Sequence, residues 1–209
     1  MTSTDIKDKI IGLARERIFA EGTSKFSVDE LTSELAMSKK TFYQVFDSKD
    51  DLIETIVELK MSEINMNMEN ILAKPVSFVR KLHAIVGFMG GVLGKISKAA
   101  FIDMHRHHPH LWNRIESFRR ERLTKTITRL VEQGMEEGYV SKCINPRVFV
   151  LAYLAAIEGV MQGSVLSHES FSSGEALNAI MMIFFTGILT DNARIEYAGL
   201  QDTITFTTS

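Results

Sequence analysis

Residues 105–110, HRHHPH, contain four histidines close together, and Asp103 lies four positions before His107. Side chains four positions apart share one face of a helix, and neutral imidazole binds zinc readily. One hypothesis is therefore a metal-dependent hydrolase that uses these histidines with Asp103 or Glu158. Pro109, however, breaks the helix there, and no spacing brings a nucleophile, a base and an orienting partner together. We expect a polar helix junction, and no metal, cofactor or catalytic residue.

A second group of polar side chains follows a tight turn at residues 35–37. Ser38 can cap a helix through KKTFYQVF, in which Phe42 and Phe46 are four positions apart and share an inward face. Four polar side chains point largely the other way: Lys39, Lys40, Tyr43 and Gln44. An α-helix fits the major groove of DNA, where its N-terminal side chains meet base edges. The pattern predicts a helix-turn-helix, although a short-helix bundle without a nucleic-acid role has the same signature.

Three further helices are predicted to position this surface. Apolar residues recur at helical spacing through residues 5–20, and Gly22 follows as a signal for the C-terminal end of a helix. Ser27 and Glu30 have the spacing of a capping box, which starts a short helix before the turn. A long apolar stripe then runs through residues 48–72, starting at a serine. This last helix is long enough to connect a small domain with a larger one.

Residues 10–52 resemble the N-terminal DNA-binding domain of TetR-family transcriptional regulators. The glycine after the first helix, the SVDEL start, the SKKTFY–F segment and the SKDDL helix opening occur in the order and spacing of that family. The resemblance implies a double-stranded and palindromic DNA operator, a homodimer, and a small-molecule effector that binds the C-terminal domain. By position it places Lys39, Lys40 and Gln44 near base edges, and it places Ser27, Thr41, Tyr43 and Lys49 on phosphates.

Two residues depart from the family pattern, and the charge of the segment is unusual. Ala36 replaces the usual glycine of the turn, so a positive φ there would be strained. Lys40 stands where glycine or alanine is common, and it adds a contact to a base or a phosphate or alters how closely the helix approaches. Residues 1–52 contain eight Lys or Arg and ten Asp or Glu. Affinity for DNA is therefore expected to depend on a focused patch and on the pairing of two domains.

The rest of the chain reads as a second helical domain, so we expect an all-α protein divided into residues 1–52 and residues 53–209. Helices are predicted at 75–89, 96–107, 110–138, 145–166 and 175–189, with the GGVLGK segment as an interruption after the first. No further element is expected in the weakly patterned tail from residue 192.

Two of these helices carry the features of a dimer interface. Small residues recur at Ala152, Ala156, Gly159 and Gly163, which lets another helix approach closely. The following helix offers an apolar face: Leu177, Ile180, Met181, Phe184 and Ile188. Together they suggest a four-helix interface between two copies, although both faces can equally belong to the core of one chain.

Large adaptable side chains on the middle helices are candidates for an effector pocket. The candidates are Phe88, Met89, Phe101, Met104, Trp112 and Phe118, with Glu158 and Gln162 as polar contacts. Glu158 and Gln162 lie one turn apart on an otherwise apolar helix, so a dimer seam or a solvent-facing surface explains them as well.

The resulting functional expectation is a dimeric repressor that a small apolar or amphipathic ligand releases from DNA. A helix-turn-helix protein controlled by a protein partner is the alternative. No apolar run reaches the length of a membrane span, and the N-terminus lacks the features of a signal peptide, so we expect a cytoplasmic protein without membrane contact.

Overall fold

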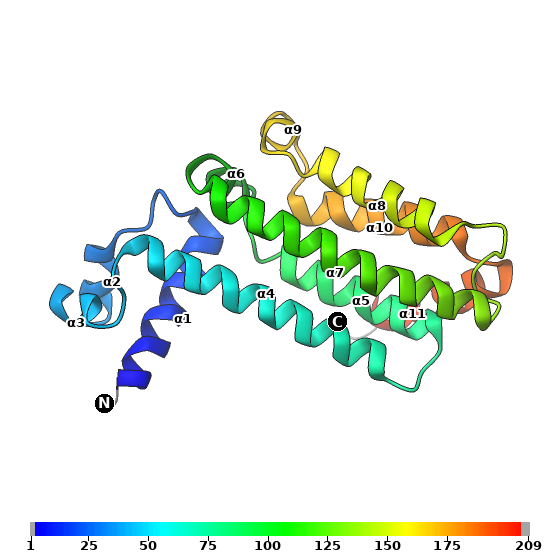
Figure 1. Cartoon of the computed structure of the whole chain (residues 1–209), viewed down its shortest axis with the longest axis horizontal. Coiled ribbons are helices and arrows are strands. Elements are labelled where there is room, and N and C mark those ends of the chain that lie inside the picture. Colours follow the sequence, from blue (N-terminus) through cyan, green and yellow to red (C-terminus); the bar gives the residue numbers. More distant parts are fainter. Residues whose placement is uncertain (1–2, 206–209) are drawn as a thin grey trace.

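A computed structural model describes residues 3–205, which form eleven α-helices (Figure 1). The first three and the start of the fourth form a small unit at one end: α1 (Ser3–Glu21), α2 (Val28–Glu34), α3 (Lys39–Tyr43) and α4 (Lys49–Ala73). The remaining helices form the larger unit: α5 (Phe78–Leu93), α6 (Lys98–His107), α7 (Pro109–Glu136), α8 (Pro146–Val160), α9 (Gly163–His168), α10 (Ser173–Ile188) and α11 (Asp191–Thr205). The all-α architecture predicted from the sequence is confirmed.

Serine caps start the helices of the small unit, as the sequence predicts. The Ser27 hydroxyl accepts a hydrogen bond from the Glu30 amide at 3.2 Å, and the Ser48 hydroxyl accepts one from the Asp51 amide at 3.0 Å. Each bond satisfies an amide that the first turn of a helix leaves unpaired. The reciprocal half of the predicted capping box is absent, since the Glu30 carboxylate instead lies 3.7 Å from the Arg17 guanidinium.

The turn between α2 and α3 is strained at the position where the family pattern has glycine. Ala36 has φ +49°, and among the described residues no other non-glycine residue has a positive φ. The Ala36 amide donates to the Ser33 carbonyl at 3.1 Å, and the Met37 amide donates to the Thr32 carbonyl at 2.9 Å. These bonds hold the left-handed conformation against the clash of the alanine Cβ with the backbone.

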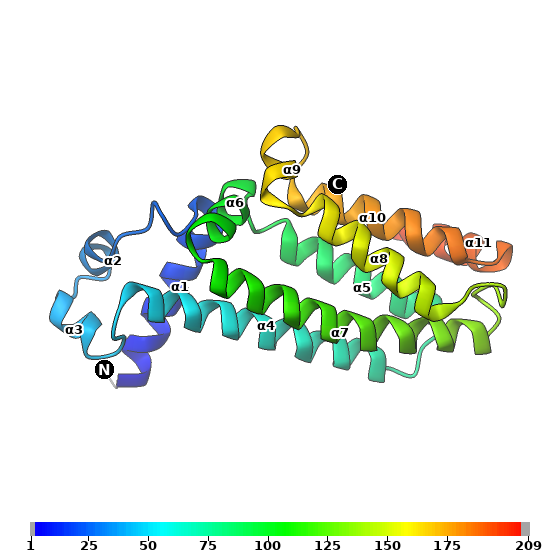
Figure 2. The same ribbon diagram turned by 45° about the horizontal axis from the view of Figure 1, so that its top comes forward.

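Two hydrophobic cores share the long helix α4. The core of the small unit combines Ile10, Ala14 and Ile18 with Phe42 and Phe46, and it continues to residues of α4, α6 and α7: Leu52, Ile53, Ile56, Val57, Met104, Leu111 and Trp112. The second core is larger and includes Met68, Ile71 and Leu72 at the other end of α4. Figures 1 and 2 show α4 and α7 side by side along most of their length. The small unit therefore packs directly on α6 and on the start of α7.

Two predicted boundaries in the larger unit are wrong. Helix α5 continues through Gly90 and Gly91, because burial of Val92 and Leu93 outweighs the cost of about 1 kcal/mol for each helical glycine. Helix α8 ends at Val160, where the buried Met161 turns the chain towards the separate helix α9.

The weakly patterned tail, for which the sequence predicts no further element, forms α11. Its Ala193 and Tyr197 side chains are buried in the larger core, and the helix packs on α5. The sequence does not predict this helix because its composition is polar and threonine-rich. Only two positions, one turn apart, form its buried face.

No single helix among residues 3–205 is both long and apolar enough to cross a membrane; α5 and α6 meet that test only together, and a bend of 73° separates them.

Candidate nucleic-acid interface and central cavity

Helix α3 presents one polar and one apolar face, as its sequence predicts. Phe42 and Phe46 are buried in the core of the small unit, with ring centroids 5.8 Å apart. Lys40, Tyr43 and Gln44 are exposed, and half of the Tyr43 surface (53%) is accessible. The helix ends at Tyr43 rather than continuing to Phe46, but the Phe46 amide still donates to the Phe42 carbonyl at 3.0 Å. The apolar face thus fixes the side of α3 that faces solvent.

Lys39 is exposed but already paired. Its Nζ lies 2.7 Å from Asp29 Oδ1 on α2, and this hydrogen bond with the carboxylate raises the pKa of Lys39. No sequence pattern points to this pair, because Asp29 and Lys39 lie on different helices. Lys40, by contrast, makes no ion pair within residues 3–205, so its ammonium group is free to meet a phosphate or a base.

The predicted phosphate contacts Ser27, Thr41 and Lys49 differ in their exposure and in their neighbouring side chains. Ser27 and Thr41 are half-buried, and the Thr41 hydroxyl lies 2.9 Å from the Ser38 hydroxyl. The Lys49 ammonium lies 5.7 Å from the centroid of the Phe26 ring, a favourable cation–π arrangement at the start of α4. The positive end of the α4 dipole adds to the field of this lysine. Their contacts with phosphate stay a prediction.

The histidine-rich segment joins the two units of the fold. Asp103 Oδ2 accepts a hydrogen bond from the Ser24 amide at 2.9 Å and a second from the Thr23 hydroxyl. His108 Nε2 lies 3.1 Å from the same Thr23 hydroxyl, and its Nδ1 lies 3.9 Å from Asp50 Oδ1. This cluster, which we call the interdomain latch (Thr23, Ser24, Asp103, His108), connects the loop after α1 with α6 and the start of α7.

Burial and hydrogen bonding set the charges in the interdomain latch. Burial disfavours the charged form of Asp103, but hydrogen bonds from Ser24 and Thr23 outweigh it and lower the pKa of its carboxyl to about 2. Burial also lowers the pKa of His108, against the opposing effect of Asp50. At neutral pH the latch therefore contains a carboxylate and a neutral imidazole.

The other histidines of the segment lie beside residues of the latch or beside Trp112. His107 lies 3.6 Å from Asp103, and the His105 ring meets the Trp112 ring edge-on at 5.3 Å between centroids. Within the described part of the chain, no three His, Cys, Asp or Glu side chains converge on a point that could hold a metal ion.

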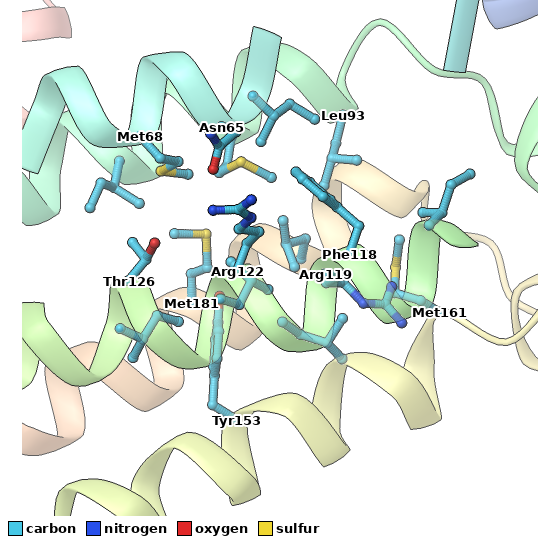
Figure 3. Close-up of a pocket in the computed structure, with 18 of the residues that line it drawn as sticks. Asn65, Met68, Leu93, Phe118, Arg119, Arg122, Thr126, Tyr153, Met161 and Met181 are labelled. Atoms are coloured by element: carbon cyan, nitrogen blue, oxygen red, sulfur yellow. The ribbon is translucent and has the colours of Figure 1, made fainter. Parts of the chain in front are cut away.

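A cavity of about 150 Å³ lies inside the larger unit between α4, α5, α7, α8 and α10 (Figure 3). A second cavity of about 140 Å³ lies beside it, towards the small unit. Because they share six lining residues, we treat them as two lobes of one site, the inner lobe and the outer lobe. The shared residues are Met61, Ile64, Met89, Leu93, Phe101 and Ile115.

Five of the eight predicted pocket residues line these lobes, and three do not. Phe118 lines the inner lobe, Met104 and Trp112 line the outer lobe, and Met89 and Phe101 line both. Phe88 packs against the larger core instead. The Glu158 carboxylate accepts a hydrogen bond from Arg120 at 2.8 Å on the outer side of α8, and Gln162 is exposed beyond the end of α8. Phe88, Glu158 and Gln162 therefore line neither lobe.

Sequence reasoning missed the polar side chains of the inner lobe, which include Asn65, Arg119, Arg122 and Tyr153. The run RRER at 119–122 is typical of a solvent-exposed helix surface. The position of Arg122 could still have been predicted, because it lies four positions after Phe118 and four before the buried Thr126. That spacing places Arg122 on the inward stripe of α7.

Helices α8 and α10 leave an apolar face uncovered in the single chain. Leu151 on α8 and Ile183 on α10 are 55% and 70% exposed, and the small residues Ala152 and Gly159 lie on the same exposed side of α8. The face of α10 suggested from the sequence is wrong, since Leu177, Ile180, Met181 and Ile188 are buried in the larger core. Gly163 belongs to α9 and does not continue the small-residue stripe.

Known proteins share both the helix-turn-helix sequence and the whole fold. Residues 10–56 match the family model described as bacterial regulatory proteins of the tetR family. An uncharacterized HTH-type transcriptional regulator of Bacillus subtilis strain 168, YvaF, is 24% identical over 185 residues, which cover 88% of this chain and 96% of that protein.

Solved structures agree along nearly the full length. A TetR-family regulator from Agrobacterium tumefaciens superposes with a TM-score of 0.69 at 17% identity, covering 90% of this chain and 100% of that one. A gamma-butyrolactone receptor, described as ArpA-like, superposes with a TM-score of 0.65 at 14% identity, covering 99% and 100%. With the capped α3 helix and its buried phenylalanines, these matches show a helix-turn-helix of the tetR family over residues 10–56 and the fold of TetR-family regulators along nearly the whole chain.

Proposed function

We propose that this regulator is a dimeric repressor that binds a palindromic operator and is released by a small apolar or amphipathic ligand. The observation that carries the proposal is the two-lobed cavity, whose outer lobe is lined by Ile18 and Phe19 of α1 as well as by α4 and α6. A molecule in this cavity would touch the DNA-binding unit itself.

The cavity gives an effector a direct route to the DNA-binding unit. Ile18 is buried in the core of the small unit, and the Phe19 carbonyl accepts a hydrogen bond from the Ser97 amide at the start of α6 at 2.8 Å. A ligand that fits better when α1 and α6 move apart would favour a new position of α3. An effector shifts such an equilibrium only through its differential affinity for the two arrangements.

The exposed face of α8 and α10 supports the dimer in this proposal. Ile183 and Leu151 would be buried against the same face of a second copy, and the nearby Ala152 and Gly159 allow close approach of helices. Two copies related by a two-fold axis would present two α3 helices to two half-sites. A regulator whose DNA-binding unit has more acidic than basic residues needs this second contact for affinity.

A regulatory role, rather than a catalytic one, is also the better account of the histidine segment. His108 and Asp103 bind Thr23 and Ser24 across the domain boundary, which occupies the groups that a hydrolase would use. The effector cavity is apolar, and the ligand control proposed for this chain parallels that of a receptor such as the ArpA-like neighbour.

The test begins with DNA that the purified full chain selects from a random pool. We expect an inverted repeat with half-sites about 10 base pairs apart, or a multiple of that. Binding should weaken with salt and in a Lys39→Ala, Lys40→Ala and Tyr43→Ala triple variant. Small apolar molecules that raise the melting temperature should lower the affinity for this DNA. If molecules that stabilise the protein leave DNA binding unchanged, control by a protein partner becomes the better proposal.

A further inference from the structure

The lining of the cavity is mostly apolar, and its charged groups all share one sign of charge. Three basic side chains line the two lobes: Lys60, Arg119 and Arg122. Among the described residues that line either lobe there is no aspartate and no glutamate. A cationic ligand would be repelled from such a site, whereas an anionic one would be attracted to it.

The three basic groups differ in what already balances their charge. Lys60 Nζ donates to Glu63 Oε1 at 3.1 Å, and Arg119 lies 3.6 Å from Glu116. Arg122 has no carboxylate within ion-pair distance among residues 3–205. Figure 3 shows its side chain extending from α7 into the inner lobe towards Asn65 on α4, whereas Arg119 extends towards Met161. Arg122 is thus the guanidinium that a ligand can reach.

Neutral polar groups surround the same part of the inner lobe with unused hydrogen-bonding capacity. Tyr153 and Thr126 are each more than nine-tenths buried, and neither side chain makes a hydrogen bond within the described part of the chain. The Asn65 amide has no side-chain hydrogen bond there either. A bound group that accepts hydrogen bonds could pair with these donors and would stabilise this end of the cavity.

Apolar surface continues from this polar end to the outer lobe. The path runs past the six shared residues to Ala100, Met104 and Trp112, and to Ile18 and Phe19 of α1. Methionine is unbranched and adapts to chains of different shape, and Met61 and Met89 stand where the lobes meet. The site is therefore suited to a molecule with one polar head and one extended apolar tail.

On the basis of the proposed effector role, we propose that the effector is an amphipathic monocarboxylate. Its carboxylate binds the Arg122 guanidinium in the inner lobe, within reach of donors such as the Asn65 amide and the Tyr153 hydroxyl. Its hydrocarbon tail lies along the methionines into the outer lobe against α1. The planar guanidinium matches the two oxygens of a carboxylate, and such charged bonds are stronger than neutral ones in an apolar surrounding.

The experiment measures ligand binding to the full chain by calorimetry without DNA, so that failure of operator binding cannot affect it. The probes are octanoate, octan-1-ol and octylamine, which share a tail and differ in the head group. We expect octanoate to bind at least about 10-fold more tightly than the alcohol, and the amine to bind most weakly. Dodecanoate extends the series if the shorter tail binds too weakly to measure.

Two arginine variants locate the head group. Arg122→Met should weaken octanoate about 10-fold or more and leave octan-1-ol nearly unchanged, while Arg122→Lys should retain part of the preference. Arg129→Met is the matched control, because Arg129 lies on the same helix, pairs with Glu69 and lines neither lobe. Equal binding of octanoate and octan-1-ol, an unchanged octanoate affinity in Arg122→Met, or no binding of any carboxylate would overturn the inference. If octanoate binds as expected but does not release DNA, the ligand class stands and the proposed repressor mechanism fails.

Discussion

Asp103 on α6 accepts a hydrogen bond at 2.9 Å from the backbone amide of Ser24, which lies in the loop between α1 and α2. The bond joins residues 79 positions apart and crosses from the larger unit to the small unit that carries α3. Next to it, the Phe19 carbonyl accepts a hydrogen bond from Ser97 at the start of α6. In the proposed dimer, any motion that changes the spacing of the two α3 helices would have to carry these contacts along or break them.

Asp103→Asn should weaken the interdomain latch. The variant loses the charge that the Thr23 and Ser24 hydrogen bonds stabilise, so we expect a loss of about 1–2 kcal/mol in the free energy of unfolding, measured by urea denaturation at pH 7. Because the folded-state pKa of Asp103 is lowered to about 2, its contribution is complete above about pH 4. The difference between wild type and variant should shrink as the pH falls from 4 to 2. Asp8→Asn, at an exposed site on α1, is the control and should show little difference at either pH.

His108 should make stability depend on pH in a higher range. Burial lowers the pKa of His108 below its ordinary value of 6.5, so proton binding favours the unfolded chain. The stabilisation is complete above about pH 6.5 and is lost as the pH falls through the folded-state pKa. Unfolding curves between pH 7.5 and 5 should show this loss in wild type and less of it in His108→Gln. A His110→Gln control with an equally reduced pH dependence would contradict the assignment to His108.

Asp29→Ala should raise the affinity for operator DNA. Removal of the carboxylate frees the Lys39 ammonium, which lies 2.7 Å from it, and removes a negative charge from the same surface. We expect tighter binding at low salt and a steeper dependence of log K on log salt, by up to about one unit, in fluorescence anisotropy. Lys39→Ala should do the opposite, and in the double variant the effect of Asp29→Ala should become smaller. Equal effects of Asp29→Ala in both backgrounds would mean that the ion pair is irrelevant to DNA binding.

Ile183→Glu should prevent dimer formation. The charge would lie in the centre of the exposed apolar face of α8 and α10, where a second copy would bury it. Sedimentation velocity should report a monomer, and affinity for the palindromic operator should fall by orders of magnitude. Ile195→Glu on α11 is the matched control, because Ile195 is as exposed as Ile183 (74% against 70%) but lies on another helix. A dimer that survives Ile183→Glu would place the interface elsewhere.

Ala36→Gly should stabilise the protein. Glycine adopts φ +49° without the Cβ clash, so we expect a gain of about 0.5–1 kcal/mol in the free energy of unfolding after the larger backbone entropy of glycine is counted. The same substitution at Ala20, an exposed helical site, should destabilise by a similar amount. A destabilised Ala36→Gly variant would show that the turn carries no strain that glycine relieves.

Local signals predicted much of the fold. Ser27, Ser38 and Ser48 cap helices because each needs only a neighbour three residues on, and Phe42 and Phe46 share a face because of helical spacing. The strain at Ala36 also followed from one residue type at one position.

Contacts between distant elements were not predictable in the same way. The sequence predicted only a polar helix junction around Asp103, because its partners, Thr23 and Ser24, lie 80 and 79 positions away. Glu158 looked like a pocket residue although its neighbour Ile157 is the one that lines the cavity, since a step of one residue turns a side chain by about 100° around the helix. The sequence of α10 is apolar on both faces. Which face stays exposed therefore depends on where α5 and α8 pack.

If Lys39 contacts DNA as predicted, its pair with Asp29 would also affect how the protein searches a chromosome. Wherever the protein lands, the lysine already has a counterion that is attached to the same polypeptide and cannot diffuse away. The release of bound ions would then add little to the free energy of binding at an arbitrary DNA sequence, so the protein would dissociate quickly from such a sequence. Only a site that supplies base contacts as well would compensate for the separation of the pair, so the carboxylate on α2 would shorten the time that the protein spends at sites other than the operator.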